Sequence, residues 1–473
     1  MIYTYDPKVM HTVLIKDVES FPKITSAYTD VTLLLGPGLL TTDGAQHRKQ
    51  RKLLNPIFSI AHLRGVSHIF FNINHRLRNA IGKRLCTEEW RVLDINGWMA
   101  RTTLEMLGQA GLGHSFDNLQ QDSTDSYGES LKSFFPVFSR IPFLRVFVSM
   151  FADYVPERLT RKILGLAYPF PNVLRVLKLS DTMTKRAKEI VHEKKKALEN
   201  GDKALAHQVG EGKDIMSILL KYNMAASQAE KLTDEEVFAQ MSNFILAGMD
   251  TTSNALSRIL NVLAGNPEAQ NKLRNEIVEA RATVGEGNNL DIPYDVLIKL
   301  PYLDAVCRET LRLYAPVNLI GRTARHDTVL PLSSPVRQKD GALMNEFIVP
   351  RDTFILMDLL GFNTDKHIWG EDAFEWRPER WLEPLPGKLT DMRVPGVYSN
   401  LMSFSGGTRS CIGFMFSQLE MKVVLAVLLP AFAFDLTDQP IVWNSGAVTY
   451  PTMGEESTRP EMLLKVKALA QAS

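Results

Sequence analysis

One long helix, marked at both ends in the sequence, limits the folds open to this chain. Thr233-Asp-Glu-Glu236 is a capping box, in which the Thr oxygen and the Glu carboxylate each satisfy a backbone amide. Gly265-Asn-Pro267 supplies a C-terminal stop. The interval between these signals corresponds to about 46 Å of helix, which would cross an entire domain. Its middle, Ile245–Thr252, places an acid and two hydroxyls after an apolar run, and a buried acid is costly unless it is used.

The rest of the pattern predicts a mostly α-helical chain with small β-sheets. Residues 60–260 are expected to be mostly helical, and further helices are expected over 302–314 and from Cys411 to about residue 429. Short strand-like segments separated by Pro and Gly lie between the last two helices, and residues 432–467 have the pattern of a small β region. Length alone leaves the number of domains open.

Composition excludes several classes of protein. Lys+Arg number 54 and Asp+Glu 53, so no overall basic field points to nucleic acid. Three cysteines without a CxxC pair argue against a disulfide scaffold or a structural zinc site, and indicate a reducing compartment. The first residues lack the apolar core of a signal peptide. The longest apolar run, Val423–Phe434, is interrupted by Pro430 and is too short for a transmembrane segment.

The sharpest local signal is the glycine-rich segment Phe404–Gly413, which ends with Cys411 before a predicted helix. Amides at a helix N-terminus stabilise a thiolate, and Arg409 adds positive charge nearby. Three interpretations follow: a buried structural cysteine, a nucleophile that would need a histidine base, or a thiolate metal ligand. The ligand fits best, because one cysteine can hold a haem iron whereas zinc needs four ligands.

The spacing Phe404-x-x-Gly407-x-Arg409-x-Cys411-x-Gly413 matches the haem-binding signature of the cytochrome P450 family at every fixed position. The chain therefore resembles this family over nearly its whole length. The resemblance implies a cytochrome P450 fold forming a single domain over 1–473. It also implies haem b as cofactor, with the Cys411 thiolate as axial ligand of the iron.

Two further segments carry the resemblance. Glu309-x-x-Arg312 is similar to the family's ExxR pair, which alone is a weak signal because i,i+3 pairs are common on exposed helices. Trp376-Arg-Pro-Glu-Arg-Trp381 looks like the family's PERF region, and Arg380 would complete a Glu–Arg–Arg network that locks a helix behind the haem. Trp stands where Phe is usual at both flanks, a change of size that we expect to be tolerated.

The middle of the long helix resembles the family's oxygen-activation motif. The resemblance implies that Asp250 relays protons and that Thr251 holds a proton near dioxygen, with small Gly248 leaving room for the gas. The alternative is a threonine that bonds back to the preceding helical turn and bends the helix.

A basic run at 47–52 has helical spacing rather than the character of a nucleic-acid patch. His47 and Arg51 share one face. In the family a WxxxR pair at this place binds a haem propionate, so histidine replaces tryptophan here. Arg322 and Arg409 match other propionate ligands. The opposite face, with Arg48 and Lys52, would point to solvent, where an acidic reductase could dock.

The resemblance implies a monooxygenase that inserts one oxygen atom of O2 into a hydrophobic small molecule, with electrons from an NADPH-cytochrome P450 reductase and cytochrome b5 as an additional candidate partner. Two alternatives stay open: a P450-fold isomerase or dehydratase that needs no reductase, and a non-catalytic truncated haem protein. The intact pair Asp250 and Thr251 argues against the first alternative.

Short segments of the sequence, such as Asn55-Pro-Ile-Phe58 and Pro378-Glu-Arg-Trp381, resemble those of fungal microsomal enzymes. Such enzymes lie on the cytoplasmic face of the endoplasmic reticulum. Their N-terminal anchor and first β and helix elements are absent here, through a truncated gene model or a soluble variant; truncation is the favoured explanation. Candidate pocket residues are mostly apolar: Phe244, Ala247, residues 317–320 and Tyr450-Pro-Thr452. A terpenoid or other secondary metabolite suits them, whereas residues 131–180 carry no readable code for selectivity.

Overall fold

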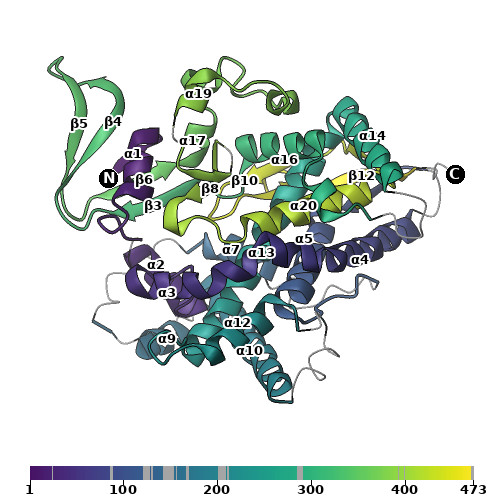
Figure 1. The fold of residues 1–473 in the computed structure, drawn as a ribbon, viewed down its shortest axis with the longest axis horizontal. Coiled ribbons are helices and arrows are strands. Elements are labelled where there is room, and N and C mark those ends of the chain that lie inside the picture. The colour runs from purple at the N-terminus through teal and green to yellow at the C-terminus, as the bar shows by residue number, and fades with distance from the viewer. Residues whose placement is uncertain are drawn as a thin grey trace.

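Helix α13 (Asp234–Ala264) crosses the middle of the molecule, and the helices on both sides pack against it (Figure 1). Its start is the predicted capping box: the Thr233 N–H donates to Glu236 Oε2 at 2.9 Å, and the Glu236 N–H donates to Thr233 Oγ1 at 3.2 Å. The predicted helix length is therefore confirmed at both ends, because Gly265 follows as the C-cap.

This computed structural model describes residues 1–23, 25–85, 89–120, 128, 131–141, 154–155, 157–166, 170–200, 209, 212–284, 291–392, 394–398 and 400–469. The helices are α1 (Pro7–His11), η1 (Thr12–Lys16), α2 (Thr25–Leu35), α3 (Gly44–Leu54), η2 (Asn55–Phe58), α4 (Ile60–Arg84), α5 (Ile95–Met106), η3 (Leu107–Leu112), α7 (Phe134–Phe138), α9 (Glu157–Gly165), α10 (Pro171–Glu199), α12 (Ile215–Ala225), α13 (Asp234–Ala264), α14 (Pro267–Thr283), α15 (Tyr294–Leu297), α16 (Pro301–Tyr314), α17 (Leu359–Asn363), α18 (Lys366–Trp369), η4 (Pro378–Trp381), α19 (Gly387–Asp391), η5 (Gly407–Arg409) and α20 (Phe414–Leu428). The strands are β1 (Ile2–Thr4), β2 (Arg91–Asp94), β3 (Leu319–Thr323), β4 (Thr328–Arg337), β5 (Leu343–Val349), β6 (Phe354–Asp358), β7 (Gly396–Tyr398), β8 (Leu401–Gly406), β9 (Phe432–Leu436), β10 (Ile441–Asn444), β11 (Tyr450–Met453) and β12 (Leu463–Ala468).

The strands form small separate sheets at the edges of the helical body. One sheet has the order β1-β6-β3, in which β1 is parallel and β3 antiparallel to β6. Another has the order β2-β12-β9, and it joins the first part of the chain to its end. Two hairpins, β4-β5 and β10-β11, and the pair β7-β8 are two-stranded. The β4-β5 hairpin projects from the body beside α1 (Figure 1).

The elements expected around the predicted site are where the sequence placed them. Helix α16 ends at Tyr314, before Ala315-Pro316, and α20 ends close to the expected position. The C-terminal β region is confirmed as β9 to β12. The buried apolar side chains join into one core that includes side chains of α13, α16 and α20. Among the described helices, none is both long and apolar enough to span a bilayer.

Candidate functional site

Cys411 lies between the 3₁₀ turn η5 and the first turn of α20. Its backbone N–H donates to the carbonyl of Phe404 at 3.0 Å, which folds the loop back on β8. Gly407 has φ +71°, and a Cβ there would lie 2.0 Å from the Leu14 carbonyl oxygen, so only glycine allows the loop to approach η1 this closely. Cys411 is accessible at its surface. Protein atoms nevertheless surround the thiol, and burial raises its pKa, while the Gly413 N–H and Arg51 act in the opposite sense.

Two arginines tie the cysteine loop to the N-terminal part of the chain. Arg51, on α3, donates through Nη1 to the Ser410 carbonyl at 2.6 Å. Arg409 donates to the carbonyl of Phe21 at 3.0 Å and forms an ion pair with Asp43. Arg51 and the cysteine loop are therefore neighbours in space although they come from distant parts of the sequence.

Further basic side chains join this cluster. Lys23 donates to the carbonyls of Leu39, Leu40 and Thr42 at 2.9–3.1 Å. Burial and the charge of Arg322 lower the pKa of Lys23 to about 7. Burial and the charge of Lys23 lower the pKa of His47 to about 4, so this histidine is neutral at physiological pH.

We call this set the cationic cluster; it consists of Lys23, His47, Arg51, Arg322 and Arg409, with the single carboxylate of Asp43 among them. Sequence analysis found four of its basic members and missed Lys23 and Asp43. Lys23 follows Phe21-Pro22 and belongs to no recognisable motif, so only the fold reveals its place.

The donor set fits haem. The excess of positive charge in the cationic cluster suits two carboxylates, and one accessible thiol beside it suits a single axial bond to iron. In the part of the chain that the structure describes, no group of three or more His, Cys, Asp or Glu side chains could hold a metal ion by itself. A haem brings most of the ligands of its iron with it, so one thiolate from the protein is enough.

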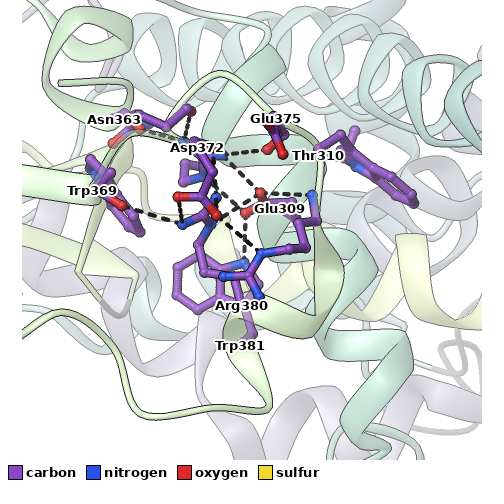
Figure 2. A network of polar contacts seen from close by, with 12 residues as sticks. Glu309, Thr310, Asn363, Trp369, Asp372, Glu375, Arg380 and Trp381 are labelled. Atoms are coloured by element: carbon purple, nitrogen blue, oxygen red, sulfur yellow. Dashed lines mark hydrogen bonds and ion pairs between the residues drawn. The ribbon is translucent and has the colours of Figure 1, made fainter. Parts of the chain in front are cut away.

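The structure brings Glu309, Arg312 and Arg380 together in the interior. Figure 2 shows Glu309 and Arg380 within this network. Arg312 makes two hydrogen bonds to the Glu309 carboxylate, at 2.8 and 2.9 Å, and Arg380 adds a contact of 3.3 Å. Arg380 also pairs with Asp372, which extends the network toward the loop before η4. Because every charge is paired and hydrogen-bonded, the arrangement joins α16 firmly to that loop.

The two tryptophans of this region do more than change a side-chain size. The indole N–H of Trp381 donates to Glu309 Oε2 at 2.9 Å, and that of Trp376 donates to Thr310 Oγ1 at 3.0 Å. A phenylalanine could make neither bond. Sequence analysis expected a tolerated substitution and missed these donors, although the indole N–H was a readable signal.

In the middle of α13, Asp250 is buried, and burial raises its pKa to about 7 against the effects of Lys132 and Asn254. The Asn254 amide donates to Asp250 Oδ1 at 3.3 Å. Thr251 Oγ1 donates to the Ala247 carbonyl at 2.7 Å, which is the back-bonded conformation named above as the alternative. In this structure the two predicted proton carriers are adjacent, but Thr251 uses its hydroxyl proton within the helix.

Gly248 lies close to a neighbouring element. A Cβ at this position would lie 3.0 Å from Leu107 Cδ2 of the π-helical segment η3. Its small size therefore allows the close packing of η3 against α13, and the room that it leaves for dioxygen stays a prediction.

A second buried acid was missed from the sequence. Glu420, on α20, is fully buried, and among the described residues neither of its carboxyl oxygens has a partner with good hydrogen-bond geometry. Burial raises the pKa of Glu420 well above its usual value, opposed only by the hydroxyl of Thr252 on α13. Glu420 lies three residues before the apolar run Val423–Phe434, and no motif marks it.

The remaining predicted features are placed as follows. Arg48 and Lys52 are exposed, as expected, but they pair with Glu19 and Glu230. Phe244 lies edge-on to Phe58, with ring centroids 5.7 Å apart. Part of the expected selectivity region, 142–153 among others, lies outside the described residues.

Comparison with known proteins decides the family. A family model described as Cytochrome P450 matches residues 1–451. The chain belongs to the cytochrome P450 family. Family membership implies a haem iron held by a thiolate and the use of O2, which agrees with the donor set around Cys411.

Several relatives of this P450 are fungal. A ganoderic acid synthetase of Ganoderma lucidum is 65% identical over 471 residues, covering 99% of this chain and 86% of the relative. Cytochrome P450 monooxygenase 91 of Postia placenta is 49% identical, covering 98% of this chain and 84% of the relative. A crystal structure of a cytochrome P450 superposes with a TM-score of 0.71 at 20% identity, over 99% of this chain and 89% of that one. This last likeness shows the P450 fold.

Proposed function

We propose that this P450 is a haem-thiolate monooxygenase that inserts one atom of O2 into a hydrophobic small molecule, a terpenoid-type secondary metabolite. The family and its monooxygenase relatives support the reaction class. The name of the Ganoderma relative supports the substrate class, and the apolar candidate pocket residues agree with it.

The observation that carries the proposal is the position of Cys411 beside the cationic cluster, with Arg51 linking the two through the Ser410 carbonyl. Cys411 would hold the iron of haem b, while Arg51, Arg322 and Arg409, with His47 and Lys23, would hold its propionates. Phe404 and Gly413 would frame the loop around the ligand. When bound, haem supplies the activation of O2 and the transfer of oxygen to the substrate.

The residues of α13 would supply protons. The pKa of Asp250, about 7, allows its carboxyl to release and regain a proton at physiological pH. The adjacent hydroxyl of Thr251 would pass that proton to the reacting oxygen once it leaves its bond to Ala247. Burial of Asp250 limits the access of bulk water to this step.

Electrons would come from NADPH through a cytochrome P450 reductase that docks on the face of α3 bearing Arg48 and Lys52. The proposal places the enzyme on the cytoplasmic face of the endoplasmic reticulum, where microsomal members of the family meet this reductase.

The deciding experiment is the carbon monoxide difference spectrum of the purified, haem-loaded and dithionite-reduced protein. We expect a strongly red-shifted Soret band in the wild type and in Cys307→Ala, whose parent thiol is buried away from the loop. Cys411→Ser should lose the band. An absent band in the wild type, or one that survives Cys411→Ser, would refute thiolate ligation by Cys411. NADPH-dependent O2 uptake with added reductase then separates a monooxygenase from a reductase-independent isomerase.

A further inference from the structure

Arg258, on α13, is held between two aromatic rings from other elements. Its Cζ lies 3.6 Å from the ring centroid of Trp443 on β10 and 4.3 Å from that of Tyr314 at the end of α16. We call Arg258, Trp443 and Tyr314 the aromatic clamp. It joins the central helix, the helix that carries Glu309 and the β10-β11 hairpin at one point.

Among the described residues, the guanidinium of Arg258 has the rings of Trp443 and Tyr314 as its partners. No carboxylate among the described residues pairs with Arg258, and its buried Nε has no hydrogen-bond partner. Burial accordingly lowers the pKa of Arg258 to about 10, still high enough to keep the charge. A flat cation between two ring faces constrains the orientation of both rings, because the attraction falls when they tilt or separate.

A second contact fixes the same hairpin to the same helix. The indole N–H of Trp443 donates to Asn261 Oδ1 at 3.3 Å, one helical turn beyond Arg258. The turn end of β10 is therefore held through both the ring face and the ring edge of Trp443.

The turn directly beyond Trp443 reaches toward the candidate pocket segments. The Thr449 N–H donates to the Pro316 carbonyl at 2.8 Å, directly before residues 317–320. A Cβ at Gly446 would lie 3.2 Å from Ser139 Oγ, so the hairpin turn also lies against the residue that follows α7. The turn thus contacts the residue directly before one candidate pocket segment, 317–320, and a residue of the 131–180 region.

Arg258 itself is too far along α13 to touch the reacting atoms. It lies seven residues after Thr251, on the same helix face and about 10 Å further along the axis. Its influence on the reaction must pass through the hairpin that it holds.

We propose that Arg258 is a positioning residue for substrate selectivity, because the aromatic clamp sets how closely the β10-β11 turn lies against residues 316–320. The inference rests on the proposed function, since it assumes that these segments line the substrate pocket. Loss of the clamp would let the turn move and would change which large ligands fit, while the haem site stays intact.

The clamp can be tested without any ligand. Hydrogen exchange measured by mass spectrometry should be faster in peptides covering 441–454 in Arg258→Met than in the wild type, with the middle of α13 unchanged. Arg258→Lys, which keeps the charge but not the flat surface, and Trp443→Phe, which keeps an aromatic ring, should show smaller increases. Arg351→Met, an exposed arginine elsewhere, is the control. Unchanged exchange of 441–454 in Arg258→Met would overturn the clamp.

Its effect on selectivity is tested with two iron-binding azoles of different size, followed by spectral titration of the haem-loaded protein. Imidazole should bind Arg258→Met within about twofold of the wild type, while the affinity for the bulky clotrimazole should change roughly tenfold. Equal changes for both ligands would indicate general damage and overturn the positioning role, as would no change for either. If the wild type itself lacks the red-shifted carbon monoxide band, the proposed function fails, while the exchange experiment still reports on the clamp.

Discussion

Burial raises the pKa of two carboxyl groups on facing helices, and the two groups have different partners. The pKa of Asp250 on α13 is about 7, and that of Glu420 on α20 is raised well above the usual value by complete burial. The difference follows from the partners: Asp250 has Lys132 and Asn254 to stabilise its charged form, whereas Glu420 has only the hydroxyl of Thr252. Asp250 can therefore exchange a proton in the physiological range, whereas burial favours the protonated form of Glu420.

Asp250→Asn should become more favourable relative to the wild type as pH rises. The unfolded carboxyl ionises near pH 4, whereas the folded one resists ionisation up to about 7, so the wild type loses stability between these values. Between pH 5.5 and 8 the free energy of unfolding of the variant, relative to the wild type, should rise by about 2 kcal/mol. Urea unfolding at the two pH values measures this, and a pH-independent difference would show that Asp250 has an ordinary pKa.

Trp381→Phe should destabilise the protein more than Trp376→Phe. Both replacements remove one indole N–H, but Trp381 donates to the buried Glu309 carboxylate and Trp376 to the neutral Thr310 hydroxyl. We expect a loss of about 1.5–3 kcal/mol for the first and about 1 kcal/mol for the second. Denaturant unfolding of the matched pair measures the difference, and equal losses would show that Trp381 contributes only its ring.

At the scale of elements, the structure shows which signals the sequence carries locally. The ends of α13 were predictable because capping box and stop involve residues a few positions apart, and the loop at Cys411 because its glycines and cysteine are contiguous. Lys23 joins the cationic cluster from a distant segment without a motif, so its role emerges only in the folded chain. The contact that a side chain at Gly248 would make likewise depends on where η3 packs in the folded chain.

The close approach of the cysteine loop to η1 gives a test at this scale. Gly407→Ala should cost far more than Gly454→Ala, although both glycines have positive φ. A Cβ at Gly407 would clash with the Leu14 carbonyl, whereas one at Gly454 would meet nothing within 4 Å, leaving only the conformational cost of about 1 kcal/mol. Haem retention and thermal unfolding of both variants measure this. Equal effects would mean that the loop can shift away from η1 without loss.

Over the whole molecule, positive and negative charges balance, so electrostatic steering of a partner protein has to come from local groups of charges. A net charge of +1 gives no long-range field. On the face of α3 expected to receive a reductase, Arg48 and Lys52 are exposed, but Glu19 and Glu230 compete for their charge. Helical spacing in the sequence predicted that Arg48 and Lys52 are exposed. It could not predict their partners, because Glu19 follows η1 and Glu230 precedes α13.

Charge changes on this face should act in opposite directions. Arg48→Glu with Lys52→Glu should slow reductase-supported reduction by about tenfold at low ionic strength. Glu19→Gln with Glu230→Gln should speed it, because both cations become available to the partner. Stopped-flow reduction measures the rates, and the differences should shrink in about 0.5 M salt. Rates insensitive to both pairs of changes would place the docking face elsewhere.

The cationic cluster has a consequence for how an anionic ligand enters. Burial and the arginines around Lys23 lower its pKa to about 7, so part of the population is neutral at pH 7.5. A dianion placed beside Lys23 would favour its charged form, and binding would draw a proton from solution. Affinity for such a ligand should therefore fall as pH rises through 7, and the binding heat should vary with the ionisation enthalpy of the buffer. Loading this protein with its ligand is, in that sense, an acid–base reaction.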